Sequence, residues 1–269
     1  MRELRNKVAV VTGAGSGIGR ALAVQLRREG CALALSDVNE VGLAQTVAEL
    51  PEGTPQVSTH TVDVSDRAAV YAHAEEVRQL HGTAHLIINN AGVAHADLVS
   101  HLEYDDIEWV MNINFWGVVY GTKAFLPMFI EQNEGHVVNM SSIFGIVGIP
   151  SQAAYCSSKF AVRGFTESLR QELEGTGVHI SSVHPGGVRT NIVKNARVRR
   201  TPDGDSSQTD LQKFDRMFRL SAPDAARVIV DGIKRERTRI LVGRDAWFLD
   251  GVQRILPNRY TRLIKRFIA

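Results

Sequence analysis

Tyr155 and Lys159 stand four residues apart in the segment PSQAAYCSSKFAVRGF, which has helical periodicity. On a helix, residues at this spacing share a face, so the phenol and the ammonium can lie side by side. A neighbouring cation favours the phenolate and lowers a tyrosine pKa from about 10 toward neutral pH. Ser142, which ends the strand-like run GHVVNMSS, could hold a substrate carbonyl beside the phenol. These residues predict proton transfer at a carbonyl or alcohol, although a Tyr–Lys pair alone also fits two solvated side chains.

A glycine cluster follows the first apolar run of the chain. The stretch VAVVTGAGSGIGRAL places Gly13, Gly15, Gly17 and Gly19 between a strand-like run and an amphipathic segment. Glycines there allow a sharp turn and the close approach of a pyrophosphate to the N–H groups of a helix. The spacing departs from the usual dinucleotide fingerprint, which needs glycine where Ile18 stands. The cluster ends in Gly-Arg instead of Gly-Lys-Ser/Thr, which disfavours kinase and ATPase chemistry.

An acidic residue ends the second apolar run. Asp37 lies eighteen residues after Gly19, where a carboxylate can accept hydrogen bonds from the adenosine ribose hydroxyls and repel a 2′-phosphate. Neither Val38 nor Ser16 offers a positive charge to neutralise that phosphate. The pattern favours NAD over NADP, and the alternative is that Asp37 is a turn residue before Asn39.

Short apolar runs alternate with longer amphipathic stretches along the chain. We expect strands at Val8–Thr12, Ala32–Asp37, Val57–Val62, His85–Asn89, His136–Ser141, His179–His184 and Arg239–Val242. We expect helices at Gly17–Glu29, Arg67–Gln79, Asp105–Glu131, Tyr155–Glu174 and Pro223–Arg235, with stops at Gly30, Gly82, Gly135 and Gly175. This alternation predicts an α/β fold. It is a single Rossmann-like domain over residues 1–269, with a doubly wound parallel sheet of about seven strands and helices on both faces.

Two more polar segments follow expected strands. DVSD begins at Asp63, which could accept from an adenine amino group, and NNAG places Asn90, Ala91 and Gly92 at an edge that a cofactor can lie against. Ligands of open parallel sheets bind at the carboxyl ends of strands, so both segments are expected near the glycine cluster. Alone, either one is an ordinary strand-to-helix loop.

The ordered set of motifs resembles the short-chain dehydrogenase/reductase family in its common single-domain form. The matching segments are Thr12–Gly19, Asp63, Asn89–Gly92, Asn114–Gly117 in NINFWG, Ser142, Tyr155, Lys159 and Pro185–Thr190 in PGGVRT. The resemblance implies that Tyr155 is the general acid/base and that Lys159 lowers its pKa and holds the nicotinamide ribose. It also implies that Ser142 orients the substrate oxygen and that Asn114 keeps a water in the proton relay through Lys159.

The same resemblance implies a nicotinamide cofactor bound along the strand ends. We expect the cofactor site at Gly13, Ser16, Gly17, Ile18, Gly19, Asp37, Asp63, Val64, Asn90, Ala91, Gly92, Tyr155, Lys159, Pro185, Gly186, Val188 and Thr190. Of these, the last four border the nicotinamide and its phosphate side. No metal site is expected.

Residues close in sequence to the catalytic motifs suggest the substrate class. We expect the substrate pocket to include His95, Ile143, Phe144, Gly187 and Ile192, which are mainly apolar. The expected reaction is NAD-dependent interconversion of a lipophilic secondary alcohol and its ketone. A 3-ketoacyl-thioester reductase, acting on acyl carrier protein or CoA esters, shares every catalytic motif and is the main alternative. A non-catalytic NAD-sensing protein is a further one.

Two segments depart from the regular alternation. Residues 191–222 are rich in turn formers and are expected to form a mobile substrate lid. Residues 225–269 hold eleven Lys or Arg and four Asp or Glu, and residues 244–269 form a basic amphipathic tail. We expect that tail to cap the pocket or a subunit interface, with a dimer favoured over a tetramer; such a tail could also lie on an anionic membrane surface.

Composition restricts the remaining possibilities. The chain has 269 residues, a net charge of +2 and two cysteines, Cys31 and Cys156, with no CxxC pair. We therefore expect no disulfide framework, a reducing cytoplasmic location with contact at a membrane surface left open, and no nucleic-acid partner.

Overall fold

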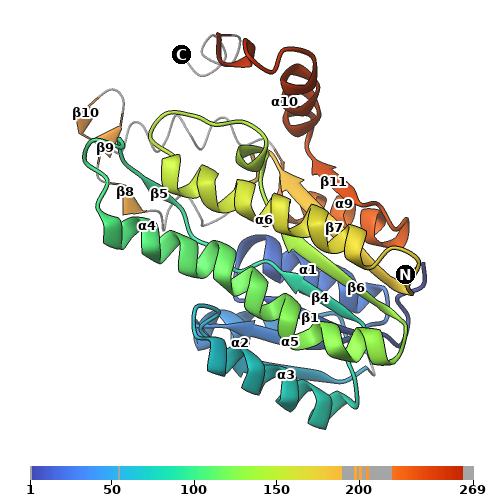
Figure 1. The fold of residues 1–269 in the computed structure, drawn as a ribbon. Coiled ribbons are helices and arrows are strands. Elements are labelled where there is room, and N and C mark those ends of the chain that lie inside the picture. The colour runs from blue at the N-terminus through green and yellow to red at the C-terminus, as the bar shows by residue number, and fades with distance from the viewer. Residues whose placement is uncertain are drawn as a thin grey trace.

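Seven parallel strands form the central sheet of the computed structural model, which describes residues 2–53, 55–189 and 220–262 and the backbone of three two-residue strands at 197–198, 200–201 and 204–205. The strand order is β11-β7-β6-β4-β1-β2-β3. The strands are β1 (Val8–Thr12), β2 (Ala32–Asp37), β3 (Val57–Thr61), β4 (Leu86–Asn89), β6 (Gly135–Met140), β7 (Val178–Pro185) and β11 (Arg239–Val242). The predicted Rossmann-like fold is confirmed (Figure 1).

Helices cover both faces of the sheet, as predicted. On one face, α1 (Gly17–Arg28), α2 (Glu40–Ala48) and α9 (Ala222–Lys234) contribute to a core that includes Leu22, Leu43 and Ile229. On the other, α3 (Arg67–His81), α5 (Gly117–Glu131) and α6 (Ala153–Glu172) contribute Val77, Phe125 and Leu169. Strands β1, β4 and β6 are buried along their whole length because helices cover them from both sides.

Three features differ from the sequence prediction. Helix α2 was not expected; it begins at an Asn39 cap whose side chain accepts from the Gly42 N–H group. The expected helix Asp105–Glu131 is divided into α4 (Tyr104–Met111), a π-helical turn (Asn112–Trp116) and α5. Gly135 does not stop a helix: α5 ends at Glu131, and Gly135 is the first residue of β6. Apolar periodicity does not reveal a π turn, because such a turn is a single-turn feature inside a segment that remains helical on both sides.

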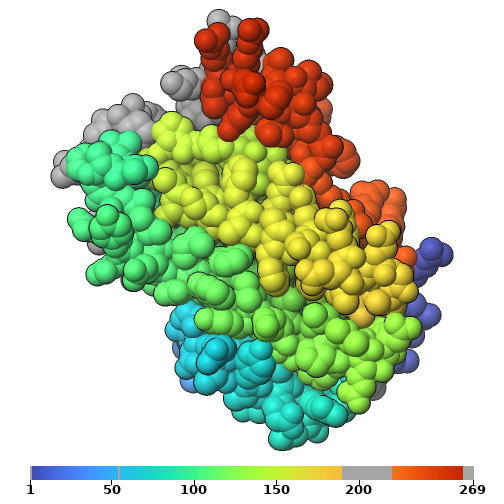
Figure 2. Space-filling model, in the orientation of Figure 1, coloured from blue at the N-terminus to red at the C-terminus, as the bar shows by residue number. Residues whose placement is uncertain are grey.

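The last described elements leave the body of the domain. Edge strand β11 leads into α10 (Arg244–Ile255), which projects beyond the sheet (Figures 1 and 2). Two-residue strands β5 (His95–Ala96) and β8 (Arg197–Val198) pair with each other apart from the main sheet, and β9 (Arg200–Thr201) pairs with β10 (Gly204–Asp205). Within residues 2–53, 55–189 and 220–262, no helix is long and apolar enough to span a bilayer.

Three buried histidines make the fold sensitive to acid. His73, His136 and His184 are each at most 2% exposed. Burial lowers the pKa of His73 to about 3 and that of His184 to about 4, and it lowers the pKa of His136 well below 6.5. The unfolded chain takes up protons near pH 6.5 and the folded chain does not, so stability is full above that pH and is lost as the pH falls.

We predict that the free energy of unfolding falls by about 1.4 kcal/mol per pH unit for each of these histidines between pH 6 and pH 5. Urea denaturation across this range measures the slope. His73→Leu is an informative variant because His73 Nε2 has no hydrogen-bond partner among the described residues. It should reduce the slope while leaving the stability at pH 8 nearly unchanged. An identical slope in wild type and variant would contradict this explanation.

Candidate active site

The polar segments identified in the sequence meet at one edge of the sheet. They follow the carboxyl ends of β1, β2, β3, β4, β6 and β7, which all point the same way because the strands are parallel. The order of connection reverses between β1 and β4, and open α/β sheets bind ligands in the crevice at such a point.

The glycine cluster forms an uncapped helix N-terminus at this crevice. Ser16 is the N-cap of α1, yet its side chain accepts no hydrogen bond, and the first turn holds no acidic residue. Gly13 and Gly17 have φ values of +64° and +55°, in the left-handed region that favours glycine. A Cβ atom on Gly19 would lie 2.0 Å from the Gly13 carbonyl oxygen. The first-turn N–H groups thus lack a side-chain acceptor, which fits a bound pyrophosphate.

Asp37 lies directly over this loop. Its Oδ2 accepts from the Gly15 N–H group at 2.8 Å, and its Oδ1 accepts from the Asn39 N–H group at 3.0 Å. The Asn39 contact is the turn role considered above, and the Gly15 contact holds the carboxylate beside the glycine loop. Val38 is 64% exposed and offers no positive charge.

Arg20 supports the loop in a way that sequence reasoning missed. Its Nη2 donates to the Gly15 carbonyl at 2.7 Å, and its Nη1 forms an ion pair with Glu49 at 2.7 Å. Thr46 of α2 donates to the Ala14 carbonyl at 2.8 Å. The Arg20 guanidinium is therefore held by side chains of α2 and of Glu49 at its end. Only a prediction of α2 would have revealed these contacts.

The NNAG segment joins the ends of β4 and β1. Asn90 Nδ2 donates to the Thr12 carbonyl at 2.9 Å, and Thr12 Oγ1 accepts from the N–H groups of Asn90 and Ala91. A Cβ atom on Gly92 would lie 3.1 Å from Asn114 Oδ1 and 3.4 Å from Lys159 Nζ. Gly92 therefore leaves open the space next to the catalytic candidates.

Asp63 lies further along the same edge. Its Oδ1 accepts from the N–H group and hydroxyl of Ser65, and its side chain is exposed, while Val64 beside it is buried. The structure thus leaves Asp63 accessible to a ligand, with Val64 supporting the turn below it.

Ser142, Tyr155 and Lys159 come together as predicted. Ser142 follows β6 and hydrogen-bonds to the Tyr155 side chain, and Lys159 lies one turn further along α6. Lys159 Nζ lies 5.7 Å from the Tyr155 ring centroid and donates to the Met140 carbonyl at 3.0 Å. The lysine is 3% exposed, so its charge is held in a nearly water-free position.

The pKa direction of the phenol corrects the sequence expectation. Burial raises the pKa of Tyr155 to about 12, and the hydrogen bond from Ser142 only partly opposes this. Burial lowers the pKa of Lys159 to about 8. The Lys159 ammonium donates to the Met140 carbonyl, and its charge does not offset the effect of burial on the Tyr155 pKa. Without a cofactor, Tyr155 is therefore a neutral proton donor at pH 7.

Asn114 lies in the π-helical turn between α4 and α5. Its Oδ1 accepts from the Val93 N–H group at 2.8 Å, and its Nδ2 donates to the Val93 carbonyl and to Ser158 Oγ at 2.9 and 3.1 Å. Ser158 donates in turn to the Tyr155 carbonyl at 2.7 Å. This chain of contacts ties the NNAG loop to the helix that carries the phenol, and Ser158 was not predicted.

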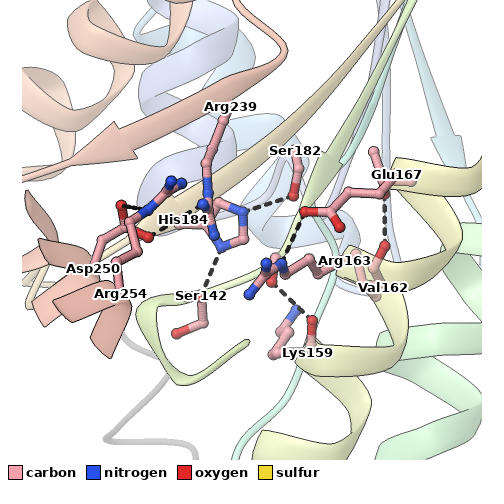
Figure 3. Close-up of polar contacts among 12 residues, drawn as sticks. Ser142, Lys159, Val162, Arg163, Glu167, Ser182, His184, Arg239, Asp250 and Arg254 are labelled. Atoms are coloured by element: carbon pink, nitrogen blue, oxygen red, sulfur yellow. Dashed lines mark hydrogen bonds and ion pairs between the residues drawn. The ribbon is translucent and has the colours of Figure 1, made fainter. Parts of the chain in front are cut away.

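His184 supports Ser142 from behind and was also not predicted as a site residue (Figure 3). Its Nδ1 lies 3.0 Å from the Ser142 carbonyl, and its Nε2 lies 2.9 Å from Ser182 Oγ. A carbonyl only accepts, so Nδ1 carries the proton and Nε2 accepts from the Ser182 hydroxyl. The His184 ring fixes the backbone at Ser142. His184 itself immediately precedes Pro185, where the expected nicotinamide loop begins.

The loop expected to border the nicotinamide is braced by α10. The Gly187 N–H group donates to Asp245 Oδ2 at 2.5 Å, and a Cβ atom on Gly186 would collide with the same carboxylate. Val188 is buried, and Pro185 ends β7. Thr190 and Ile192 lie outside the described residues.

The predicted substrate pocket is only partly supported. Phe144 packs edge-to-face on Tyr155, with ring centroids 6.3 Å apart, as a pocket residue should. Ile143 is 4% exposed and packs with Ile146 and Val147, so it supports the wall instead of lining it. His95 is 1% exposed, with Nε2 at 3.3 Å from Asp106 Oδ2, so its ring lies inside the protein and its contact with a substrate stays a prediction. A buried charge partner on α4 holds this ring inside.

The two segments outside the regular alternation are described in part. The expected lid, residues 191–222, falls mostly outside the described residues. In the tail, Leu249 and Tyr260 pack on the loop after Ser142, and the Gly148 N–H group donates to the Tyr260 hydroxyl at 3.3 Å. The exposed side chains on and just after α10 include Trp247, Phe248, Ile255 and Leu256.

Comparisons with known proteins agree with this geometry. A family model described as short chain dehydrogenase matches residues 7–201. SadH of Mycobacterium tuberculosis, which carries the name of an oxidoreductase, is 46% identical over 272 residues that cover 100% of this chain and 98% of SadH. Estradiol 17-beta-dehydrogenase 11 of Homo sapiens is 32% identical over 271 residues, covering 100% of this chain and 85% of that protein.

Solved structures give the same result. A short-chain dehydrogenase/reductase from Burkholderia phymatum, crystallised in complex with NAD, superposes with a TM-score of 0.88 at 33% identity, covering 96% of each chain. Levodione reductase superposes with a TM-score of 0.81 at 29% identity, covering 91% of this chain and 98% of that one. With the parallel sheet, the glycine loop and the Ser–Tyr–Lys group in place, the chain belongs to the short-chain dehydrogenase/reductase family of oxidoreductases.

Proposed function

We propose that this protein is an NAD-dependent oxidoreductase that interconverts a lipophilic secondary alcohol and its ketone. The observation that carries the proposal is the group of Ser142, Tyr155 and Lys159 beside the open face of Gly92, in which the serine and the lysine are buried and the tyrosine is half-buried. A phenol hydrogen-bonded to a serine hydroxyl, with a desolvated ammonium one helical turn away, is suited to moving one proton at a substrate oxygen.

Each residue of this group has a separate task in the proposed reaction. Ser142 holds the substrate oxygen beside the phenol, and Tyr155 gives the proton in ketone reduction or takes it in alcohol oxidation. When bound, the nicotinamide supplies or accepts the hydride and, in its oxidised form, brings a positive charge near the phenol. Since Tyr155 is neutral at pH 7, we expect reduction to proceed at neutral pH and oxidation to accelerate toward alkaline pH.

The cofactor preference rests on Asp37. A carboxylate held over the glycine loop by the Gly15 N–H group can accept from ribose hydroxyls and repels a 2′-phosphate. The Burkholderia phymatum relative is described in complex with NAD, which supports the same choice. A preference for NADPH would instead favour the alternative function, a 3-ketoacyl-thioester reductase.

Asp37→Asn should collapse the discrimination between NAD and NADP. Loss of charged hydrogen bonds to the ribose costs about 1.5–3 kcal/mol, so kcat/KM with NAD should fall roughly 10- to 100-fold, while repulsion of NADP is relieved. Initial rates with each cofactor measure the ratio. Asp63→Asn is the matched control, because we place it at the adenine and expect it to affect both cofactors equally. An unchanged ratio in Asp37→Asn would remove the basis for NAD preference.

The names of two relatives support the substrate class. Estradiol 17-beta-dehydrogenase 11 and levodione reductase are named for a steroid alcohol and for a dione. Both names denote chemistry at a hydroxyl or ketone on a largely hydrocarbon frame. Phe144 beside Tyr155 presents an aromatic surface to such a substrate.

We also propose that the tail caps the active-site loop and contributes to a dimer interface. Tyr260 and Leu249 already pack on the loop after Ser142, which leaves Trp247 and Ile255 at 60% and 79% exposure for a second subunit. Light scattering of the full chain and of a Trp247→Ser/Ile255→Ser variant tests this, and a dimer unaffected by the variant would exclude this surface. Co-sedimentation with anionic vesicles tests the membrane alternative.

A further inference from the structure

A polar cavity lies on the opposite side of His184 from the catalytic group. It encloses about 370 Å³ between α6, β7, β11 and α10, and its lining includes Arg163, Glu167, Arg170, Ser182, Arg239 and Arg254. Figure 3 shows Arg163 and Glu167 of α6 on one side of His184, and Asp250 and Arg254 of α10 on the other. The cavity is separate from the glycine loop, which follows β1 four strands into the sheet from β11.

Strand register and helix spacing place these side chains together. Arg239 is paired in register with Ser182, so the two side chains stand next to each other on the same face of the sheet. Arg163, Glu167 and Arg170 recur at the spacing of one helical face on α6, which packs over β7. Arg254 comes from the last turn of α10.

The charges of this cluster do not balance. Four arginines line the cavity, and two carboxylates pair with them: Glu167 with Arg163 at 2.9 Å, and Asp250 with both Arg239 and Arg254 at 3.2 and 2.9 Å. Arg170 has no ion pair within the part of the chain that the structure describes. Positive neighbours also act on the titratable groups here, because Arg163 contributes to lowering the pKa of both Arg239 and His184.

Arg239 is the most informative member of the cluster. Its side chain is 21% exposed, and its Nη1 contacts Asp250. Its Nε and Nη2 atoms are buried and have no hydrogen-bond partner among the described residues. Together these two atoms form the edge of a guanidinium that binds carboxylate or phosphate through two parallel hydrogen bonds. Because both atoms are buried, a ligand in the cavity would reach that edge only after the Arg239 side chain turned, while Asp250 would keep its pair with Arg254.

We infer that this arginine cavity is a second binding site, for the phosphate or carboxylate group of a small molecule. An oxyanion there would compensate the excess positive charge and satisfy the unpaired edge of Arg239. Its position next to Ser182, whose hydroxyl donates to the ring that holds the Ser142 carbonyl, places the ligand two hydrogen bonds away from the catalytic serine.

The test is a thermal-unfolding titration of the full chain with sodium phosphate or sodium acetate, against sodium chloride at equal ionic strength and with saturating NAD. Phosphate, acetate or both should raise Tm saturably, by about 3 °C at tenfold excess over Kd. Stabilisation by only one anion would assign the ligand group as phosphate or carboxylate. Isothermal titration gives the affinity.

Variants separate this cavity from the glycine loop, which also attracts phosphate. Arg163→Gln/Arg170→Gln should weaken anion binding at least about tenfold. Arg235→Gln is the matched control, because it removes an equivalent i,i+4 ion pair with Asp231 on α9, outside the cavity, and should bind as wild type does. Equal anion binding in the double variant and wild type would overturn the proposal. So would the absence of any saturable shift in wild type, which is the result expected if a side chain of a second copy fills the cavity.

Discussion

Tyr155→Phe should abolish turnover while leaving the fold and cofactor site in place. The substitution removes one hydroxyl, which hydrogen-bonds to Ser142 and is the only group we assign to proton transfer at the substrate oxygen. General acid–base catalysis contributes roughly 10²- to 10⁴-fold, so kcat should fall by at least about 100-fold in both directions. Steady-state formation and consumption of NADH measure this loss.

Two controls accompany this variant: its affinity for the cofactor and a substitution of a tyrosine far from the site. NAD binding, followed by fluorescence titration, should change by less than about tenfold, the effect of one hydrogen bond. Tyr71→Phe on α3, whose side chain is 43% exposed, should behave as wild type. Retained turnover in Tyr155→Phe would show that another group or a water moves the proton.

Lys159→Met should inactivate the protein and at the same time stabilise it. The ammonium is buried beside the Tyr155 ring, and removing it takes away the charge that assists the phenolate and the donor that we assign to the nicotinamide ribose. We expect kcat/KM to fall roughly 100- to 1,000-fold, in line with the loss of two charge-assisted contacts. The alkaline rise of the oxidation rate should also move to higher pH.

The stability gain follows from the depressed pKa of this lysine. The folded value is about 8 and the ordinary value is 10.5, so at pH 7 the folded chain carries a buried charge at a cost of about 3 kcal/mol. The hydrogen bond to the Met140 carbonyl is lost with it, which leaves a net gain of roughly 1–2 kcal/mol. The gain is greatest below pH 8 and disappears as the pH rises toward 10.5, where neither state is charged.

Urea denaturation of the cofactor-free protein at pH 7.5 and pH 10 checks this prediction. Lys123→Met, on the exposed side of α5, is the matched control and should change neither stability nor activity. A Lys159→Met variant that is less stable than wild type at pH 7.5 would show that its packing contacts outweigh the desolvation of the charge.

The sequence was sufficient for the sheet because the central parallel strands are nearly continuous apolar runs. All seven expected strands are present, with ends that shift by at most one residue, because burial on both faces leaves a clear signal at β1, β4 and β6. The glycine loop, Asp37 and the Ser–Tyr–Lys group were also accessible, since motif residues at strand ends must meet at one edge.

What the sequence did not reveal depends on contacts between distant segments. The π turn that holds Asn114 has no periodic signature, and α2 is short and contains Gly42. His95 closely follows the NNAG segment in sequence, which suggested a contact with substrate. In the structure its ring is buried beside the Asp106 carboxylate of α4. The rise in the Tyr155 pKa was missed for the same reason, because a Tyr–Lys spacing says nothing about how dry the pair is.

The most direct test of the proposed activity is NADH formation by the wild-type protein with a panel of secondary alcohols, followed by absorbance with NAD or NADP at pH 9. We predict turnover of lipophilic secondary alcohols with NAD, at least about tenfold faster than with NADP, and the reverse reaction on the matching ketones at pH 7. NAD binding without turnover of any alcohol or ketone would contradict the proton transfer assigned to the Ser142–Tyr155–Lys159 group. A clear preference for NADP would contradict the cofactor selection assigned to Asp37.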